Sequence, residues 1–183
     1  MANNLSKREN LYRYLRRFKS VYETRKHLKK ILSRKRLLSK EYVDLIEYDL
    51  RMCNRCLAGD VLKKGGQEFY DTEREERYLS EAEELEDDNF LVAEVRTVIS
   101  RPTLSGNMGG DIRDYYLIDL ASRRYARLEH FDEVSPEAEY GRFTLTNPSL
   151  RGKNLSYTIK DIAYKNPLEP RTVEKSLESL LGR

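Results

Sequence analysis

The sequence has no long apolar segment, and this absence excludes the classes of protein that depend on one. No uncharged apolar run among its 183 residues approaches the ~18 residues that a transmembrane helix needs. The N-terminal residues also lack the apolar core of a secretory signal, so we expect none. A charged fraction of 36% places the composition on the polar side of globular proteins. The sequence therefore argues against an integral membrane protein with transmembrane helices.

Cysteine and histidine are scarce, with two of each in the chain. Two cysteines cannot form a disulfide framework, so we expect a reducing compartment: cytoplasm, nucleus or a virion. Cys53 and Cys56 form a CxxC pair, but a structural zinc site needs four ligands, and neither His27 nor His130 is expected beside them. Cys53 falls in phase with the apolar positions of a predicted helix, which favours a packed thiol over metal binding or redox chemistry. No cofactor is predicted.

Acidic residues are nearly missing from the first part of the chain. Residues 1–40 contain fourteen Lys or Arg but only two acids, Glu9 and Glu23, whereas residues 68–88 contain eleven acids and two bases. The formal net charge of +3 conceals this separation. Such asymmetry predicts either a polyanionic partner or an assembly held together by complementary charges.

Helical periodicity dominates the N-terminal third. Apolar residues at spacings of three and four predict an amphipathic helix over residues 4–22. A change of phase then predicts a break near Glu23–Arg25, with Thr24 as the N-cap of a second helical segment. Ser39 is a good N-cap for a third helix, whose stop signals are the glycines at positions 59, 65 and 66.

Basic side chains lie opposite the apolar positions of the first two helical segments. The candidate nucleic-acid-binding residues are Arg13, Arg16, Arg17, Lys26, Lys29, Lys30 and Arg34. Lysine and arginine on the solvated face of a helix neutralise phosphates and release counterions, which gives affinity without sequence information. Docking on an acidic protein surface and a merely solvated face are the alternatives. Only two of the first forty residues are acidic, and this makes a merely solvated face the weaker alternative, because such a face usually carries charges of both signs.

The predicted fold class is α+β, in three parts. A basic helical region (1–66) is followed by an acidic linker helix (67–88), with Thr72 and Glu75 spaced as a capping box. Residues 89–183 change to a period of two, which predicts about five short strands in a small antiparallel sheet or open barrel. Asn147-Pro148 is expected to stop one of these strands, and a C-terminal helix is predicted over Thr172–Leu181.

A few segments invite an interpretation as catalytic or ligand-binding motifs. The glycine-rich segment Ser105–Gly110 lacks the spacing and lysine of a phosphate-binding loop, so we expect a flexible loop between strands. The best catalytic candidate is Glu94-Val95-Arg96 with Asp111 or Asp119, which together resemble the carboxylates of a metal-dependent nuclease. Arginine is a poor replacement for the lysine of such sites, so we expect no enzyme.

Three functional hypotheses follow, in descending order. The first is a non-catalytic nucleic-acid-associated protein that binds phosphate backbones through the basic helical arm. The second is a structural subunit of a large assembly, such as a virion or a ribonucleoprotein, that docks by charge complementarity. The third is the metal-dependent nuclease. The sequence leaves open whether DNA or RNA is bound, and which protein a structural subunit would contact.

Overall fold

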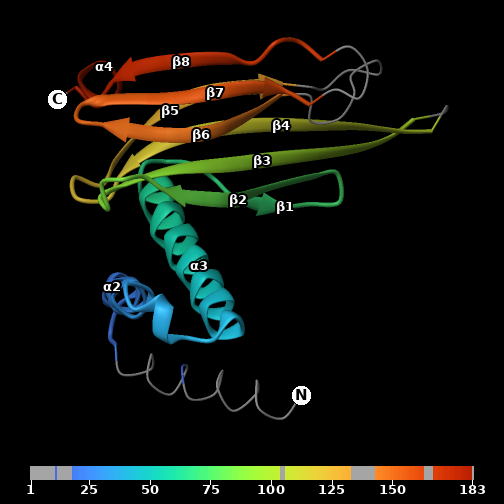
Figure 1. The fold of residues 1–183 in the computed structure, drawn as a ribbon. Coiled ribbons are helices and arrows are strands. Elements are labelled where there is room, and N and C mark those ends of the chain that lie inside the picture. The colour runs from blue at the N-terminus through green and yellow to red at the C-terminus, as the bar shows by residue number, and fades with distance from the viewer. Residues whose placement is uncertain (1–10, 12–17, 104–105, 133–142, 163–166, 183) are drawn as a thin grey trace. The chain divides into compact units, whose positions relative to one another are not determined.

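A computed structural model describes residues 11, 18–103, 106–132, 143–162 and 167–182 (Figure 1). It combines helices with antiparallel sheets, which confirms the α+β class. The chain divides into two compact units, residues 1–57 and residues 58–183, and each is described by itself. The helix predicted over residues 4–22 lies outside the described residues apart from Leu11, which is helical, and residues 18–22.

The first unit contains helix α2 (Val21–Leu32), the short 3-10 helix η1 (Lys35–Leu37) and the first part of helix α3 (Lys40–Lys64). Ser20 caps α2, because its side chain accepts a hydrogen bond of 3.2 Å from the backbone N–H of Glu23. Phe18, Lys19 and Ser20 are not helical. The predicted break near Glu23–Arg25 is therefore wrong by a few residues, and Thr24 lies inside the helix.

Helix α3 begins directly after Ser39, as predicted, and continues past Gly59 to end before Gly65 and Gly66. Gly66 has a φ of 93°, the left-handed conformation that favours glycine at a helix end. Gly59 does not stop the helix because its neighbours Ala58, Val61 and Leu62 are buried against a sheet. This burial outweighs the roughly 1 kcal/mol by which glycine is less favourable than alanine in a helix interior.

A small apolar core holds the described helices of the first unit together. Leu28 of α2 packs with Ile46 and Cys53 of α3 and with Leu11. All four side chains are buried, so the predicted burial of Cys53 is confirmed. Because α2 directs its apolar face at α3, its opposite face is left to solvent.

The second unit is built from two antiparallel sheets instead of the single sheet or barrel expected. The five-stranded sheet has the order β1-β2-β3-β4-β5 and the three-stranded sheet the order β6-β7-β8. In Figure 1 the three-stranded sheet lies over the five-stranded one. The strands are β1 (Tyr70–Asp71), β2 (Glu75–Glu84), β3 (Phe90–Thr103), β4 (Gly106–Asp119), β5 (Arg124–Asp132), β6 (Phe143–Arg151), β7 (Asn154–Asp161) and β8 (Arg171–Ser176), followed by helix α4 (Leu177–Leu181).

The five-stranded sheet is covered on both faces. Leu91, Ala93 and Val95 of β3 pack with Ala58, Val61 and Leu62 at the end of α3. The alternate residues Phe90 and Val92 pack with side chains of the three-stranded sheet and α4. The first half of β3 is therefore buried on both sides.

The acidic segment is the main error of the sequence analysis, because Glu75–Glu84 forms strand β2 and not a linker helix. β2 pairs antiparallel with β3 from Glu75 opposite Ile99 to Glu84 opposite Leu91. The pattern interpreted as a capping box makes a turn between strands instead. Oγ1 of Thr72 accepts a hydrogen bond of 3.0 Å from the backbone N–H of Glu75. The same local hydrogen bond serves a turn as well as a helix N-terminus.

Three further elements differ from expectation. Gly106–Gly110 lies in strand β4, paired with the end of β3, and is not a loop. β6 continues through Asn147-Pro148, where a register shift and a φ of 52° at Asn147 accommodate the proline within the strand. The final helix is only Leu177–Leu181, because residues 171–176 pair with β7.

Candidate nucleic-acid interface

The solvent face of α2 carries the described part of the predicted basic surface. Lys26 and Lys30 are exposed on α2, and Arg34 is exposed just beyond its end. Lys26 and Lys30 are four residues apart on α2, so at 1.5 Å per residue they lie about 6 Å apart along the helix axis. Arg13, Arg16 and Arg17 lie outside the described residues. Of the four predicted residues that the structure describes, Lys26, Lys30 and Arg34 are exposed, and whether they bind nucleic acid stays a prediction.

These cations form no ion pair with a carboxylate in the described part of the chain. No described carboxylate lies within 4 Å of the charged groups of Lys26, Lys30 or Arg34, or of Lys35 and Arg36, which are also exposed. Glu23, one of the two acids among residues 1–40, has its own role. Its Oε2 accepts a hydrogen bond of 3.0 Å from the backbone N–H of Lys19. The positive charge of this face is therefore not cancelled by described neighbours.

Two basic residues of α2 do not belong to this surface. Lys29 is only half exposed. Arg25, which the sequence analysis did not single out, is buried, and its Nε donates a hydrogen bond of 2.7 Å to Oδ1 of Asn54 on α3. Arg25 lies three residues before the buried Leu28, so the phase of the apolar stripe was the signal that could have identified it.

The CxxC pair presents one buried and one exposed thiol. Cys53 is buried and Cys56 is exposed, and neither forms a disulfide. Burial raises the pKa of Cys53 to about 11, with smaller contributions from the Cys56 thiol and Asp49. The ring of His27 stacks on Phe18, with the centroids 3.9 Å apart. Among the described residues, no three His, Cys, Asp or Glu side chains are grouped so that they could hold a metal ion.

The carboxylates suggested for a nuclease are engaged with arginine, hydroxyl and backbone N–H groups. Asp111 is buried and accepts hydrogen bonds from Arg96, at 2.6 and 3.3 Å, and from Arg113, at 3.0 and 3.1 Å. Glu94 accepts a hydrogen bond of 3.1 Å from the hydroxyl of Tyr115. Asp119 lies at the other end of β4, where it accepts hydrogen bonds from two backbone N–H groups of the following turn. Arg96 links two of these carboxylates, because its Nε also lies 3.8 Å from Oε1 of Glu94. In the part of the chain that the structure describes, no three such side chains are grouped so that they could hold a metal ion.

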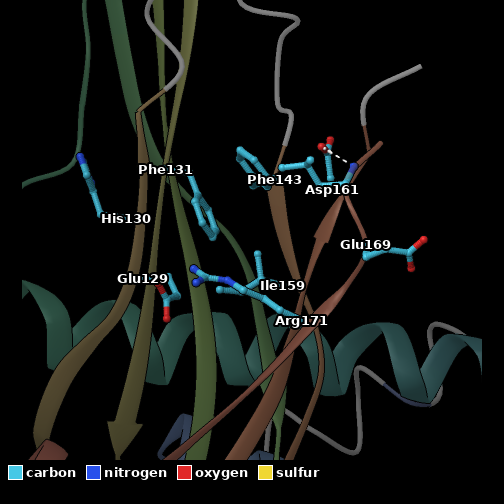
Figure 2. Close-up of a pocket in the computed structure, with 9 residues that line it drawn as sticks. Glu129, His130, Phe131, Phe143, Ile159, Asp161, Glu169 and Arg171 are labelled. Carbon is cyan, nitrogen blue, oxygen red and sulfur yellow. Dashed lines mark hydrogen bonds between the residues drawn. The ribbon is translucent and has the colours of Figure 1, made fainter. Parts of the chain in front are cut away.

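A groove of about 470 Å³ lies in the second unit, between β5 and the three-stranded sheet. Figure 2 shows Phe131 and Phe143 beside it and Arg171 extending toward Glu129. Asp161 accepts a hydrogen bond of 2.9 Å from the backbone N–H of Leu168. Carboxylates outnumber arginine in the lining, so the groove does not favour a polyanion. The sequence could not reveal it, because its residues come from four strands and from the segment just before β8.

None of the helices in the described ranges has the length and apolarity needed to cross a membrane. Comparison of the chain with protein-family models, with curated proteins and with solved structures finds no match.

Proposed function

We propose that this protein is a non-catalytic nucleic-acid-associated protein that binds phosphate backbones through the basic face of its N-terminal unit. The observation that carries the proposal is the exposure of Lys26, Lys30 and Arg34 with no described carboxylate within ion-pair distance. An uncompensated row of cations is costly to maintain in the free protein and favourable beside a polyanion.

The type of contact follows from the type of side chain. Lysine on a helix surface supplies a mobile point charge, which suits a phosphate but does not select a base. Binding is therefore expected to depend weakly on sequence and steeply on salt, because each neutralised phosphate releases condensed counterions. The proposal covers DNA and RNA alike.

A salt titration with two charge-matched variants tests the proposal. The triple variant Lys26→Ala, Lys30→Ala, Arg34→Ala removes three positive charges from the basic face. The control Arg151→Ala, Lys153→Ala, Lys160→Ala removes three exposed positive charges from the three-stranded sheet. Fluorescence anisotropy with random single- and double-stranded oligonucleotides would be measured at several salt concentrations.

We expect the first variant to reduce the slope of log affinity against log salt by about 2 to 3, since each lost phosphate contact removes about 0.7 to 0.9. The control is expected to retain the slope of the natural chain. Equal losses in both variants would show that only total charge matters, and the proposed surface would be wrong.

Docking of the same face on an acidic protein neighbour, within a virion or a ribonucleoprotein, is the alternative function. It predicts little affinity for random oligonucleotides at any salt concentration. It also predicts that a protein partner is recovered with the natural chain and lost with the Lys26, Lys30 and Arg34 triple variant. Both results together would replace nucleic acid by protein as the partner.

A further inference from the structure

Two exposed glutamates share one face of the outermost long strand of the five-stranded sheet. Glu81 and Glu83 of β2 flank Ala82, which packs with the end of α3, so both glutamates lie on the opposite face of the sheet. β1 reaches only Glu76 and Arg77, and in the described ranges no other strand pairs with the outer side of β2. This stretch therefore offers two carboxylates and, among its unpaired backbone groups, carbonyl oxygens, all of which accept hydrogen bonds.

The negative charge of this pair is not balanced by a neighbouring cation. No described Lys, Arg or His lies within 4 Å of the carboxylate of Glu81 or Glu83. Glu94 pairs with Glu81 across the strands and adds a third carboxylate, and Arg96, 3.8 Å from Glu94, is held more closely by Asp111, at 2.6 Å. Desolvation and the charge of Glu81 raise the pKa of Glu83, the direction expected for a carboxylate that lacks a compensating cation.

The complementary surface is on the same chain. Lys26 and Lys30 are exposed on α2 with no described carboxylate at ion-pair distance, and they lie about 6 Å apart along the helix axis. Glu81 and Glu83 are two residues apart on a strand, which at ~3.4 Å per residue separates them by about 7 Å. The two spacings agree within the reach of a lysine side chain, whose three donors suit both carboxylates and carbonyl oxygens.

We propose that the basic face of α2 in one copy of the chain docks on Glu81 and Glu83 of β2 in a second copy. A second copy is the partner because this chain carries both charged surfaces, each exposed and without a described ion pair. The contact is heterologous, since the two copies contribute different surfaces. Ion pairs between exposed groups are weak and are screened by salt, so the copies associate at low salt and high protein concentration.

The docking uses the same lysines as the proposed function but does not depend on it. A nucleic acid that binds Lys26 and Lys30 competes with the second copy, because the polyanion and the acidic strand require the same cations. A phosphate backbone presents more negative charge than two carboxylates and gains counterion release, so the nucleic acid displaces the second copy. Copies of the chain thus associate without nucleic acid and separate as it binds.

The experiment measures the mass of the full chain by sedimentation velocity, at several protein concentrations and in about 20 mM or about 500 mM salt. The chain is first stripped of nucleic acid, so that no bridging polyanion holds copies together. The strand variant Glu81→Lys, Glu83→Lys and the helix variant Lys26→Glu, Lys30→Glu each reverse the charge of one surface. A mixture of the two variants restores opposite charges at every contact between unlike copies.

We expect the natural chain to associate reversibly at low salt and to be monomeric at high salt. Each variant alone should associate at least about tenfold more weakly, because like charges then meet at the contact, and an equal mixture of the two should regain the association. The control Glu174→Lys, Glu178→Lys reverses two exposed acids of β8 and α4 and should associate like the natural chain. Thermal unfolding of each variant checks that the fold is retained.

A natural chain that stays monomeric at low salt and high concentration would overturn the docking, and so would a strand variant that associates as strongly as the control. An oligonucleotide added to the natural chain separates the two proposals. If it binds to a chain that never associates, the proposed function stands and the docking is wrong. If the natural chain associates, the strand variant does not, and neither binds the oligonucleotide, the docking stands and the proposed function is wrong.

Discussion

Arg25 and Asn54 form a buried hydrogen bond between α2 and α3, with Nε of Arg25 2.7 Å from Oδ1 of Asn54. Both side chains are less than 5% exposed, so water cannot replace either partner. The bond fixes the basic helix on its neighbour by a polar contact in addition to the apolar core. It also explains why Arg25 points toward α3, whereas Lys26 and Lys30 on the same helix are exposed.

Replacing Arg25 by alanine is expected to lower the free energy of unfolding by about 2 kcal/mol, because the Asn54 side chain would be left buried without this donor. Lys26→Ala is the control, since Lys26 is the next residue and is exposed. Its effect should stay within about 0.5 kcal/mol. Urea unfolding of both variants measures the difference, and equal stabilities would contradict the structural role of Arg25.

The two glycines near the end of α3 are expected to respond oppositely to alanine. A methyl group at Gly59 would lie 3.7 Å from Leu79, an ordinary contact, so Gly59→Ala should stabilise the helix by up to about 1 kcal/mol. A methyl group at Gly65 would come within 2.1 Å of the Tyr125 ring, whose hydroxyl donates a hydrogen bond of 2.8 Å to the Gly65 carbonyl. Gly65→Ala should therefore be destabilising. Thermal unfolding of the pair checks the prediction, which fails if both shift the midpoint in the same direction.

Glu86 is expected to make stability depend on pH in the acid range. Hydrogen bonds from the Ser149 hydroxyl and the Leu150 N–H, both 2.6 Å, lower its pKa from 4.5 to about 2. A carboxyl group whose pKa is lower in the folded state stabilises the fold above the unfolded value. This contribution is present above pH 4.5 and is lost as the pH falls toward 2.

Glu86→Gln should flatten the decline of stability between pH 4.5 and pH 2, as measured by urea unfolding at successive pH values. Glu73→Gln, at an exposed position in the turn before β2, is the control and should leave the decline unchanged. If the Glu86 variant declines as steeply as the natural chain, its hydrogen bonds contribute nothing to acid stability.

The two thiols are expected to differ in reactivity. At pH 8 iodoacetamide should label the exposed Cys56 in the native protein, while Cys53 should react only after unfolding. Burial both blocks access to Cys53 and raises its pKa to about 11, which leaves little thiolate. Mass spectrometry should therefore count one label in the native state and two in denaturant. Cys56→Ser should carry none when native; a label on native Cys53 would refute its burial.

Local sequence patterns were sufficient to predict helices, which make their own hydrogen bonds, and strands in which apolar residues recur at every second position. The start of α3 after Ser39 and the antiparallel strands after residue 89 were predicted in this way. The exposure of Lys26 and Lys30 also follows from helical phase alone.

Long-range pairing explains what the sequence could not predict. The segment that forms β2 has charges and apolar residues compatible with a helix, and only the presence of β3 beside it selects the strand. The contacts of Asp114 with Arg127 and His130 depend on a bulge opposite Tyr115 and Tyr116, and no residue type marks that bulge in the sequence. Arg127 and His130 were consequently separate residues until the structure joined them.

The acidity of β2 has a consequence for how molecules of this protein meet. β1 pairs only with Glu76 and Arg77, so among the described residues the rest of the outer edge of β2 has no strand beside it. Glu81 and Glu83 are exposed there, and desolvation together with the charge of Glu81 raises the pKa of Glu83. Two such edges repel each other as they approach. The carboxylates on this edge thus disfavour edge-to-edge pairing between copies of the chain, the step by which a sheet would extend into a fibre.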